Sequence, residues 1–336
     1  MITMKTRRID LHHHIGPDFY IEALKRNGVN EIVDGEPLPD WREEYMLDFM
    51  ERFDIEAVVA SLVAPGVDFP KIPNSREIAK SLSREINEGF ARLKEKYNGW
   101  FEGLATLPAN PDDALAEMEY CLDTLKLGGV ALFSNYEGHY LGEDRFDELF
   151  NELNKRRAVV VMHPEVSCGG IVPADIGFTR HVLEFAFETT RAAFSLYCSP
   201  NQTLLKYPHV KVVLPHLGGT LPYSLCRAIG AIRVKEQPFD CKALNVAGLE
   251  NLVNHFWFDT ALVSSPWTFP SLLALVDTDK IVFGTDAGVN WKFSPLGNEH
   301  IVNELNLYFR GRKEDLERIN YQNALDLFPQ FKPLFE

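Results

Sequence analysis

Short apolar runs recur along the chain, each bounded by polar or turn-forming residues. They are rich in Val, Ile, Leu and Phe and almost continuously apolar, which is typical of strands buried on both faces of a parallel sheet. Strands are therefore predicted at residues 7–13, 57–64, 100–107, 129–135, 158–164, 210–216, 255–261 and 280–286.

Segments with the helical spacing of apolar residues lie between these runs. The clearest are residues 74–97, 111–127, 145–157 and 270–278. Strands that alternate with helices indicate βαβ units and a parallel sheet. Eight such units favour an α/β fold of the (β/α)₈ (TIM) barrel type over an open doubly wound sheet. A GxGxxG sequence, which would mark a dinucleotide site, does not follow the first strand.

Two long connections interrupt the regular alternation. Residues 15–56 follow the first predicted strand and contain two helical segments, and residues 217–254 follow the sixth. Long insertions of this kind usually cap the active-site mouth of a barrel. The last helical segment, residues 312–328, is expected to pack on the outside of the barrel. No repeat or linker divides the chain, so residues 1–336 are predicted to form a single domain.

Composition and charge limit the kinds of molecule that such a barrel is expected to bind. The chain has 336 residues and a formal net charge of −14, which argues against a nucleic acid partner because phosphate binding needs a basic surface. It contains neither a secretory leader pattern nor an apolar run of about 18 residues that could span a membrane. The five cysteines are odd in number and widely spaced. This pattern predicts reduced thiols and a cytoplasmic protein.

The first predicted strand contains the run Asp10-Leu11-His12-His13-His14. Residues two apart on a strand point to the same side. With Ile9 and Leu11 facing the surrounding helices, His12 and His14 would face the barrel axis, where two imidazoles can bind one metal ion. Taken alone, the run is equally consistent with a polar cluster at the strand end.

Three further residues strengthen the metal hypothesis. His163, His216 and Asp286 end the fifth, sixth and eighth predicted strands. The C-terminal ends of barrel strands are where such enzymes build their sites. Three imidazoles and a carboxylate suit zinc, iron or manganese with one position left open.

The order of these residues resembles the amidohydrolase superfamily. The stretches RFDELFNELNKRRAVVVMHP, WFDTA and VFGTDAG, and the region around His216, resemble the amidohydrolase-related decarboxylases, which include the aminocarboxymuconate semialdehyde, hydroxybenzoate and methylsalicylate enzymes. The resemblance implies metal ligands at His12, His14, His163 and Asp286, with His216 as a catalytic residue. The predicted fourth strand has no Lys, so one divalent ion is expected, Zn²⁺ first and Mn²⁺ or Fe²⁺ as alternatives.

Two positions depart from the family pattern. Hydroxybenzoate decarboxylases often have Glu three residues after the strand-six histidine, whereas this chain has Gly219. This is closer to the aminocarboxymuconate and methylsalicylate branches and argues against a resorcylate-type mechanism. The Tyr-Pro expected after the strand-eight aspartate is replaced by Ala287-Gly288, which would widen the pocket.

The leading functional hypothesis is non-oxidative decarboxylation of an aromatic or unsaturated, salicylate-like acid. Asp286 or His216 would deliver a proton to the carbon that carries the carboxylate. In the semialdehyde branch, His216 would instead activate a water molecule that adds to the substrate first. A hydrolase of a lactone, ester or amide would use the same residues, and a non-catalytic binding barrel is a third hypothesis.

Several residues are weaker candidates for substrate contact. Arg191 and Arg227 could bind a carboxylate, although a structural ion pair or a subunit contact would also explain them, and Trp291 in a mouth loop could stack on a ring. Asp259 could orient a ligand histidine or cap the turn that follows it. The expected partner is a small carboxylate, and the family resemblance implies a homodimer or tetramer.

Overall fold

The computed structural model describes residues 6–31, 37–38, 40–62, 66–165, 179–198, 201–234, 252–288 and 294–336. Its main sheet has eight parallel strands in the order β1-β2-β3-β4-β7-β8-β9-β10. Their bounds are β1 Arg8–His14, β2 Ile55–Ser61, β3 Phe101–Thr106, β4 Gly129–Phe133, β7 Val159–His163, β8 Lys211–Leu214, β9 Phe256–Asp259 and β10 Ile281–Val282. All eight predicted strands are confirmed.

The chain that continues beyond β10 closes the sheet against β1. The backbone N–H of Leu11 donates to the carbonyl of Phe283 (3.0 Å), that of Asp286 donates to His12 (2.8 Å), and that of His14 donates to Ala287 (2.7 Å). Strand β1, with His12 and His14, and the segment with Asp286 therefore lie side by side, although they are at opposite ends of the sequence. The predicted TIM barrel is confirmed.

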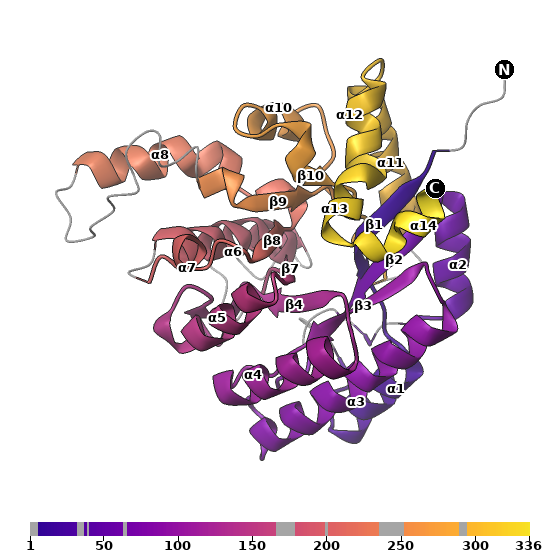
Figure 1. Cartoon of the computed structure of the whole chain (residues 1–336), viewed down its shortest axis with the longest axis vertical. Coiled ribbons are helices and arrows are strands. Elements are labelled where there is room, and N and C mark those ends of the chain that lie inside the picture. The colour runs from indigo at the N-terminus through magenta and orange to yellow at the C-terminus, as the bar shows by residue number, and fades with distance from the viewer. Residues whose placement is uncertain are drawn as a thin grey trace.

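Helices surround the barrel (Figure 1). Their bounds are α1 Asp18–Arg26, α2 Glu43–Arg52, α3 Ser75–Lys96, α4 Pro111–Glu119, α5 Asp147–Lys155, α6 Thr179–Cys198, α7 Thr203–Lys206, α8 Leu221–Val234, α10 Thr268–Leu273, α11 Ser294–Tyr308, α12 Lys313–Glu317, α13 Asn323–Leu327 and α14 Lys332–Phe335. A short antiparallel pair, β5 (Asn135–Tyr136) and β6 (His139–Tyr140), follows β4.

The long connections fold as helical additions. The insertion after β1 contains α1 and α2, as predicted, and the connection after β8 begins with α8. Residues 235–251 of that second connection lie outside the described residues. The helices α6 and α11 were not predicted from the sequence.

Local sequence explains where individual helices begin, as α4 illustrates. Asn110 precedes the helix, and its side chain accepts a hydrogen bond from the backbone N–H of Asp113 (3.3 Å). Pro111 occupies the first helical position, where its missing N–H leaves no intrahelical bond unmade. The acidic side chains of Asp112 and Asp113 lie in the first turn, where they favour the positive end of the helix dipole.

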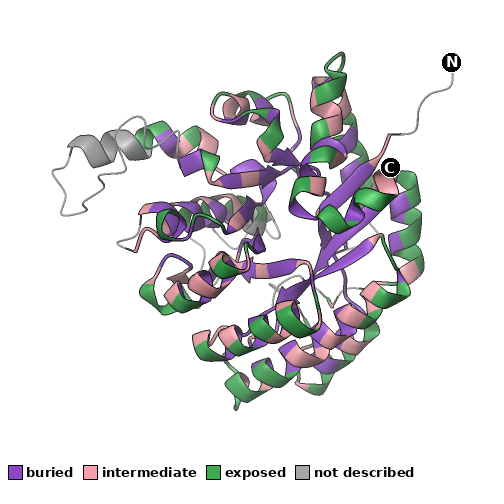
Figure 2. Cartoon of the chain, in the orientation of Figure 1, coloured by how far each residue is buried: buried purple, intermediate pink, exposed green. Residues whose placement is uncertain are grey.

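Two clusters of buried apolar side chains form the core (Figure 2). The larger one lies between the strands and the surrounding helices and includes Val58, Val160 and Val212. The smaller one fills the barrel interior with alternate residues of the same strands, such as Val59, Val161 and Val213. Strands covered on both faces account for the almost continuous apolar runs in the sequence.

The C-terminal segment differs from its prediction. Ala324, Leu327, Phe328 and Phe331 belong to the interior cluster, not to the outer one. Gln330 donates a hydrogen bond to Glu102 at the start of β3 (2.8 Å). The segment therefore closes the N-terminal end of the barrel. The apolar spacing of its residues indicates a helix but not which surface that helix covers.

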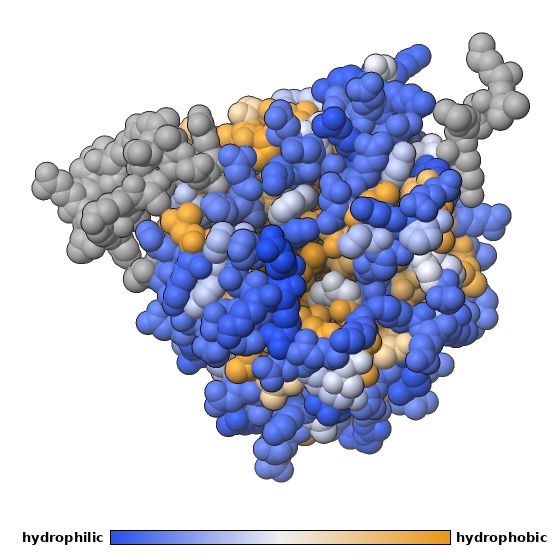
Figure 3. Space-filling view, in the orientation of Figure 1, coloured by the Kyte–Doolittle hydropathy of each residue, from blue (hydrophilic) through white to orange (hydrophobic). Residues whose placement is uncertain are grey.

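The surface of the molecule is mainly hydrophilic on the face seen in Figure 3, with hydrophobic side chains gathered near a central hollow. Within the described ranges, no helix is both long and apolar enough to cross a lipid bilayer. Cys121 and Cys226 are free thiols. Cys168 and Cys241 lie outside the described residues.

Candidate metal centre

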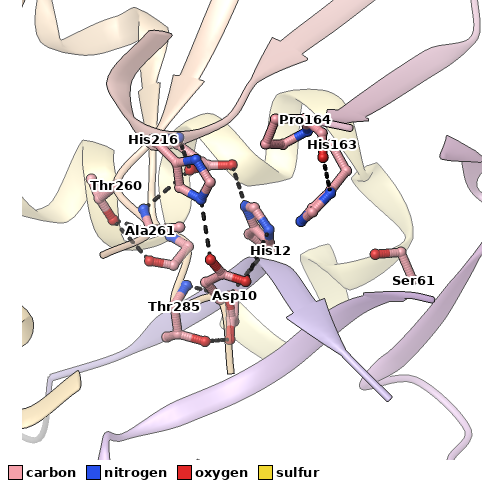
Figure 4. A network of polar contacts seen from close by, with 12 residues as sticks. Asp10, His12, Ser61, His163, Pro164, His216, Thr260, Ala261 and Thr285 are labelled. Carbon is pink, nitrogen blue, oxygen red and sulfur yellow. Dashed lines mark hydrogen bonds and ion pairs between the residues drawn. The ribbon is translucent and has the colours of Figure 1, made fainter. Parts of the chain in front are cut away.

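Four of the predicted site residues meet at the C-terminal end of the barrel. One ligand atom from each of His12, His14, His163 and Asp286 lies within 4.8 Å of the others. Figure 4 shows the rings of His12, His163 and His216 gathered around the same space. His12 and His14 are almost completely buried, whereas His163 and Asp286 retain some exposure. The cluster therefore opens toward solvent on the side of His163 and Asp286.

Each of the three histidines has a partner at its Nδ1 atom. The Nδ1 atom lies 2.8 Å from Asp259 Oδ2 in His12, 3.2 Å from Ser61 Oγ in His14 and 2.8 Å from the Pro164 carbonyl oxygen in His163. A histidine that donates its Nδ1 proton keeps a lone pair on Nε2. These contacts orient the rings with Nε2 toward the centre, where the Nε2 atoms of His12 and His14 lie 3.1 Å apart.

Asp286 lies between the histidines of the cluster. Its Oδ1 atom is 3.1 Å from His14 Nε2 and 3.5 Å from His12 Nε2, while its Oδ2 atom is 3.1 Å from His216 Nε2. His216 thus contacts the cluster through Asp286 and is not one of the four converging residues. One carboxylate therefore contacts both the converging histidines and His216.

The backbone at these positions is unusual. His216 and Asp286 have φ of +54° and +57°, in the left-handed region that His and Asp adopt more readily than most side chains. Leu217 follows with φ +51°. Such conformations are unfavourable and concentrate at functional sites. Here they turn the chain sharply after β8 and β10, so that both side chains point across the barrel mouth.

The side chains of Ile9 and Leu11 on β1 do not point in the direction expected from the sequence. Ile9 and Leu11 belong to the interior cluster, not to the helix-facing one. His12 and His14 nevertheless reach the centre, because the pairing of β1 with β2 shifts between Asp10 and His13. His13 faces outward, with its ring centroid 6.0 Å from that of Phe49 on α2. Simple alternation identifies the right pair of histidines, but a β-bulge is what points them inward.

Asp259 at the end of β9 performs both of the roles considered for it. Its Oδ2 atom accepts from His12 Nδ1, and its Oδ1 atom accepts from the backbone N–H groups of His216 (2.9 Å) and Ala261 (3.1 Å). The carboxylate is completely buried. Asp259 therefore orients one member of the cluster and fixes the turn that carries His216.

The electrostatics of the cluster favour a neutral imidazole at His14 and His163 and an ionised carboxylate at Asp286. These are the protonation states in which the side chains can bind a metal ion. Burial lowers the pKa of His14 and, together with the charges of the neighbouring histidines, lowers that of His163 further. Burial alone raises the pKa of Asp286, but His12 and His14 outweigh it and hold the pKa well below 3.8. Burial also lowers the pKa of His12, yet Asp259 and Asp286 more than compensate and raise it to about 9.

Aromatic side chains flank the open side of the cluster. The rings of Phe133, at the end of β4, and Phe185, on α6, lie edge-to-face with His163, with centroid separations of 6.1 and 5.8 Å. Both phenylalanines are partly exposed. Neither residue stands out in the sequence, because Phe133 resembles an ordinary strand residue and α6 was not predicted.

The structure explains both departures from the family pattern. Gly219 has φ +61°, and a Cβ atom there would lie 2.2 Å from the carbonyl oxygen of Ala186 on α6. A glutamate cannot take this position without moving the turn. Gly288 has φ +113°, and a Cβ atom there would lie 1.7 Å from the carbonyl oxygen of His14. Gly288 therefore permits the close approach of this segment to β1.

The weaker candidates for substrate contact lie outside the cluster. Arg191 pairs with Glu188, which also accepts a hydrogen bond from the Tyr140 hydroxyl (2.8 Å). Arg227 is exposed on α8. Trp291 lies outside the described residues. The structure thus places Arg191 in an ion pair on its own helix and does not bring Arg191 or Arg227 to the four converging side chains.

The donor set fits a divalent cation. Three imidazole nitrogens and one carboxylate oxygen converge in a largely buried space, and partners at Nδ1 hold the three rings in place. This is the arrangement that zinc, manganese and iron sites use, with an open position for substrate on the exposed side.

Comparison with known proteins agrees with this geometry. The family model described as Amidohydrolase matches residues 9–330. Decarboxylase yanB of Aspergillus niger is 31% identical over 97% of this chain and 88% of its own length. The 6-methylsalicylic acid decarboxylase of Penicillium expansum is 29% identical over 98% of both chains.

A solved structure shares the fold. It is the dihydroxybenzoic acid decarboxylase of Polaromonas sp. JS666, determined with bound manganese and the inhibitor 2-nitroresorcinol. Its TM-score is 0.74 at 21% identity, and the match covers 96% of this chain and 97% of that one. The family model spans almost all of the barrel, including every strand that contributes to the cluster, so the chain belongs to the amidohydrolase family.

Proposed function

We propose that this protein is a metal-dependent decarboxylase of a salicylate-like aromatic acid. The observation that carries the proposal is the setting of His163, whose ring borders the open side of the cluster and lies against Phe133 and Phe185. A planar aromatic acid fits between such rings with its carboxylate toward the cation. Both relatives, each matched over nearly the whole of this chain, are named decarboxylases, and the 6-methylsalicylic acid enzyme supports this substrate class.

His12, His14, His163 and Asp286 would hold one divalent ion. When bound, this ion supplies a positive anchor for the substrate carboxylate and a Lewis acid. The ligands suit Zn²⁺ first, with Mn²⁺ or Fe²⁺ as alternatives that availability decides. Elemental analysis of the protein as isolated tests this assignment, and a stoichiometric content of manganese without zinc would contradict the zinc preference.

His216 and Asp286 would move the proton. The Nε2 atom of His216 lies 3.1 Å from Asp286 Oδ2, so a proton can pass between them and on to the ring carbon that carries the carboxylate. Protonation of that carbon allows its bond to the carboxylate to break, carbon dioxide leaves, and aromaticity is restored. Phe133 and Phe185, whose rings lie against His163, would limit the access of water during this step.

The test is a substrate panel with the metal-loaded protein. We expect salicylate-type acids, 6-methylsalicylate among them, to release one carbon dioxide per phenol formed. The competing hypothesis is hydrolysis of a lactone, ester or amide by the same residues. Turnover of a lactone or ester panel with no carbon dioxide from any acid would overturn the proposal.

We also propose that the protein forms a homodimer or tetramer through α6, α8 and α10. The helix α8 contacts both of the others. Tyr223 and Trp267 are 86% and 83% exposed, and Phe187 is 47% exposed. Exposed aromatic side chains on neighbouring helices are typical of protein interfaces. Light scattering of wild type and of Tyr223→Glu tests this, and a wild-type monomer would contradict it.

A cytoplasmic location is proposed from the cysteines. Cys121 and Cys226 are free, as expected in a reducing compartment. Cell fractionation tests this assignment, and recovery of the protein outside the cytoplasm would contradict it.

A further inference from the structure

The β-bulge in β1 has a defined place and size. Asp10 pairs with Val58 and His13 pairs with Ala60, so Leu11 and His12 together oppose the single residue Val59. Two residues opposite one is the signature of a β-bulge. Leu11 and His12 consequently both face the barrel interior, and every later residue of the strand changes sides.

A bulge disturbs the backbone ladder and requires another acceptor for the displaced N–H group. The side chain of Asp10 provides it, because its Oδ1 atom accepts from the backbone N–H of His12 at 3.1 Å. Asp10 is completely buried. Its carboxylate is therefore part of the local structure that points His12 and His14 toward the centre.

The same carboxylate also binds the strand that carries Asp286. Oδ1 accepts from the backbone N–H of Thr285 at 3.0 Å, and Oδ2 accepts from the Thr285 hydroxyl at 2.5 Å. Oδ2 further contacts His13 Nδ1 at 2.9 Å. Thr285 immediately precedes Asp286, whose own N–H donates to the carbonyl of His12. Asp10 and Thr285 are labelled in Figure 4.

We propose that Asp10 is a positioning residue for the metal centre. It holds the bulge of β1 and the turn after β10 in one register, and this sets where His12 and His14 lie relative to Asp286. Both carboxylate oxygens already accept hydrogen bonds, and Asp10 is not among the converging ligand atoms. The inference rests on the proposed metal site but not on the reaction performed there.

Three variants test this role. Asp10→Ala removes every acceptor. Asp10→Asn keeps one oxygen for His12 and Thr285, and Thr285→Val keeps the side-chain shape but loses the hydroxyl contact. Glu102→Gln is the matched control, because Glu102 is equally buried and hydrogen-bonded but lies at the other end of the barrel. Each protein is stripped of metal and titrated with Co²⁺, recording its visible spectrum and its affinity by chelator competition.

We expect Asp10→Ala to bind Co²⁺ with about tenfold or more lower affinity and to show an altered spectrum. Losses of this size follow when a contact that orients metal ligands is removed. Asp10→Asn should recover most of both properties, and Glu102→Gln should bind Co²⁺ like wild type. A wild-type spectrum and affinity in Asp10→Ala would overturn the inference. If Asp10→Ala does not fold, Thr285→Val decides, and unchanged affinity and spectrum in that variant would likewise overturn it.

The experiment separates this inference from the proposed function. Wild-type protein that takes up no Co²⁺ contradicts the metal site itself and the inference with it. Wild-type protein that binds Co²⁺ but releases no carbon dioxide contradicts only the proposed reaction. The spectra and affinities of the variants then still decide the role of Asp10.

Discussion

At the residue scale, the centre depends on carboxylates that do not themselves converge on it. Asp259 orients His12 and fixes the turn that carries His216. The two contacts use different oxygens of its carboxylate, which is completely buried. Because buried acceptors of this kind hold the tautomer and direction of a ligand histidine, they influence metal affinity without touching the ion.

Replacing Asp259 with Asn tests this dependence. The amide nitrogen cannot accept from His12 Nδ1, so the ring would place its proton on Nε2 and lose the lone pair directed at the centre. We expect metal affinity to fall by about 10- to 100-fold, measured by chelator competition. Asp315→Asn, in a remote contact with Thr278, is the control. Equal affinities in the two variants would contradict the orienting role.

His216 offers a second test at this scale. In His216→Asn, the new side chain tolerates the left-handed backbone at this position but cannot exchange a proton. We expect kcat for decarboxylation to fall by about 10²- to 10⁴-fold, with the metal content unchanged.

The control for this variant is His139→Asn. His139 is a half-exposed histidine paired with Glu143, and its replacement should leave kcat near wild type. Loss of metal from His216→Asn would instead make His216 a ligand, and wild-type kcat would remove it from the reaction.

At the element scale, the loops after the strands determine what surrounds the centre. The turn after β8 packs so closely on α6 that Gly219 has no room for a side chain. That contact also helps to hold α6, whose Phe185 ring lies against His163. The absence of a glutamate at this position and the presence of an aromatic wall are therefore linked through the packing of one helix.

The loop after β2 contains a pH-dependent contact. Both oxygens of Asp68 accept from the backbone N–H of Ala109, at 2.9 and 3.1 Å. Burial raises the pKa of Asp68 from 3.8 to about 6, with the charge of Glu137 adding to the effect. Because the pKa of Asp68 is higher in the folded protein than its ordinary value, protonation of Asp68 favours the folded state. The contribution of Asp68 to stability is therefore complete below about pH 3.8 and is lost as the pH rises through 6.

Asp68→Asn should therefore stabilise the protein at pH 8 and not at pH 4. The amide oxygen still accepts from Ala109, and no buried charge remains. We expect a gain on the order of 1 kcal/mol at pH 8, after allowing for the partial exposure of the side chain. Urea unfolding at the two pH values measures it, and an equal effect at both would contradict the assigned pKa.

At the scale of the whole molecule, the C-terminal segment closes one end of the barrel, and the candidate metal centre lies at the other end. The C-terminal segment fills the N-terminal end through Leu327, Phe328 and Phe331, while the converging ligands occupy the opposite end. The interior between them is apolar. A barrel plugged in this way separates residues needed for stability from those needed for chemistry.

Phe328→Ala tests the plug. Phe328 is completely buried in the interior cluster, so its truncation leaves a cavity that the strands cannot fill. We expect the free energy of unfolding to fall by about 3–5 kcal/mol, with metal affinity of the folded protein retained. Leu307→Ala, at a 60% exposed position on α11, should change stability by less than about 0.5 kcal/mol. Similar losses in the two variants would place the segment outside the core.

The sequence by itself determined the architecture and the membership of the centre. Eight apolar runs separated by helical segments indicate the barrel, because parallel strands are apolar on both faces. His12, His14, His163 and Asp286 could be named because the ends of parallel strands meet at one rim. Local periodicity and the position of a residue within its own strand place these residues and His216 at one rim, and the family resemblance implies which four of them are the ligands.

The tertiary structure alone decided how those residues are held. The contact of Asp10 with Thr285 joins positions 275 residues apart, and that of Asp259 with His12 spans 247. Three other features likewise depend on contact with another element. They are the bulge that directs His12 inward, the close approach at Gly219 and the interior placement of Phe328. Local sequence specifies which side chains are available, but only packing against distant elements fixes the direction in which they point.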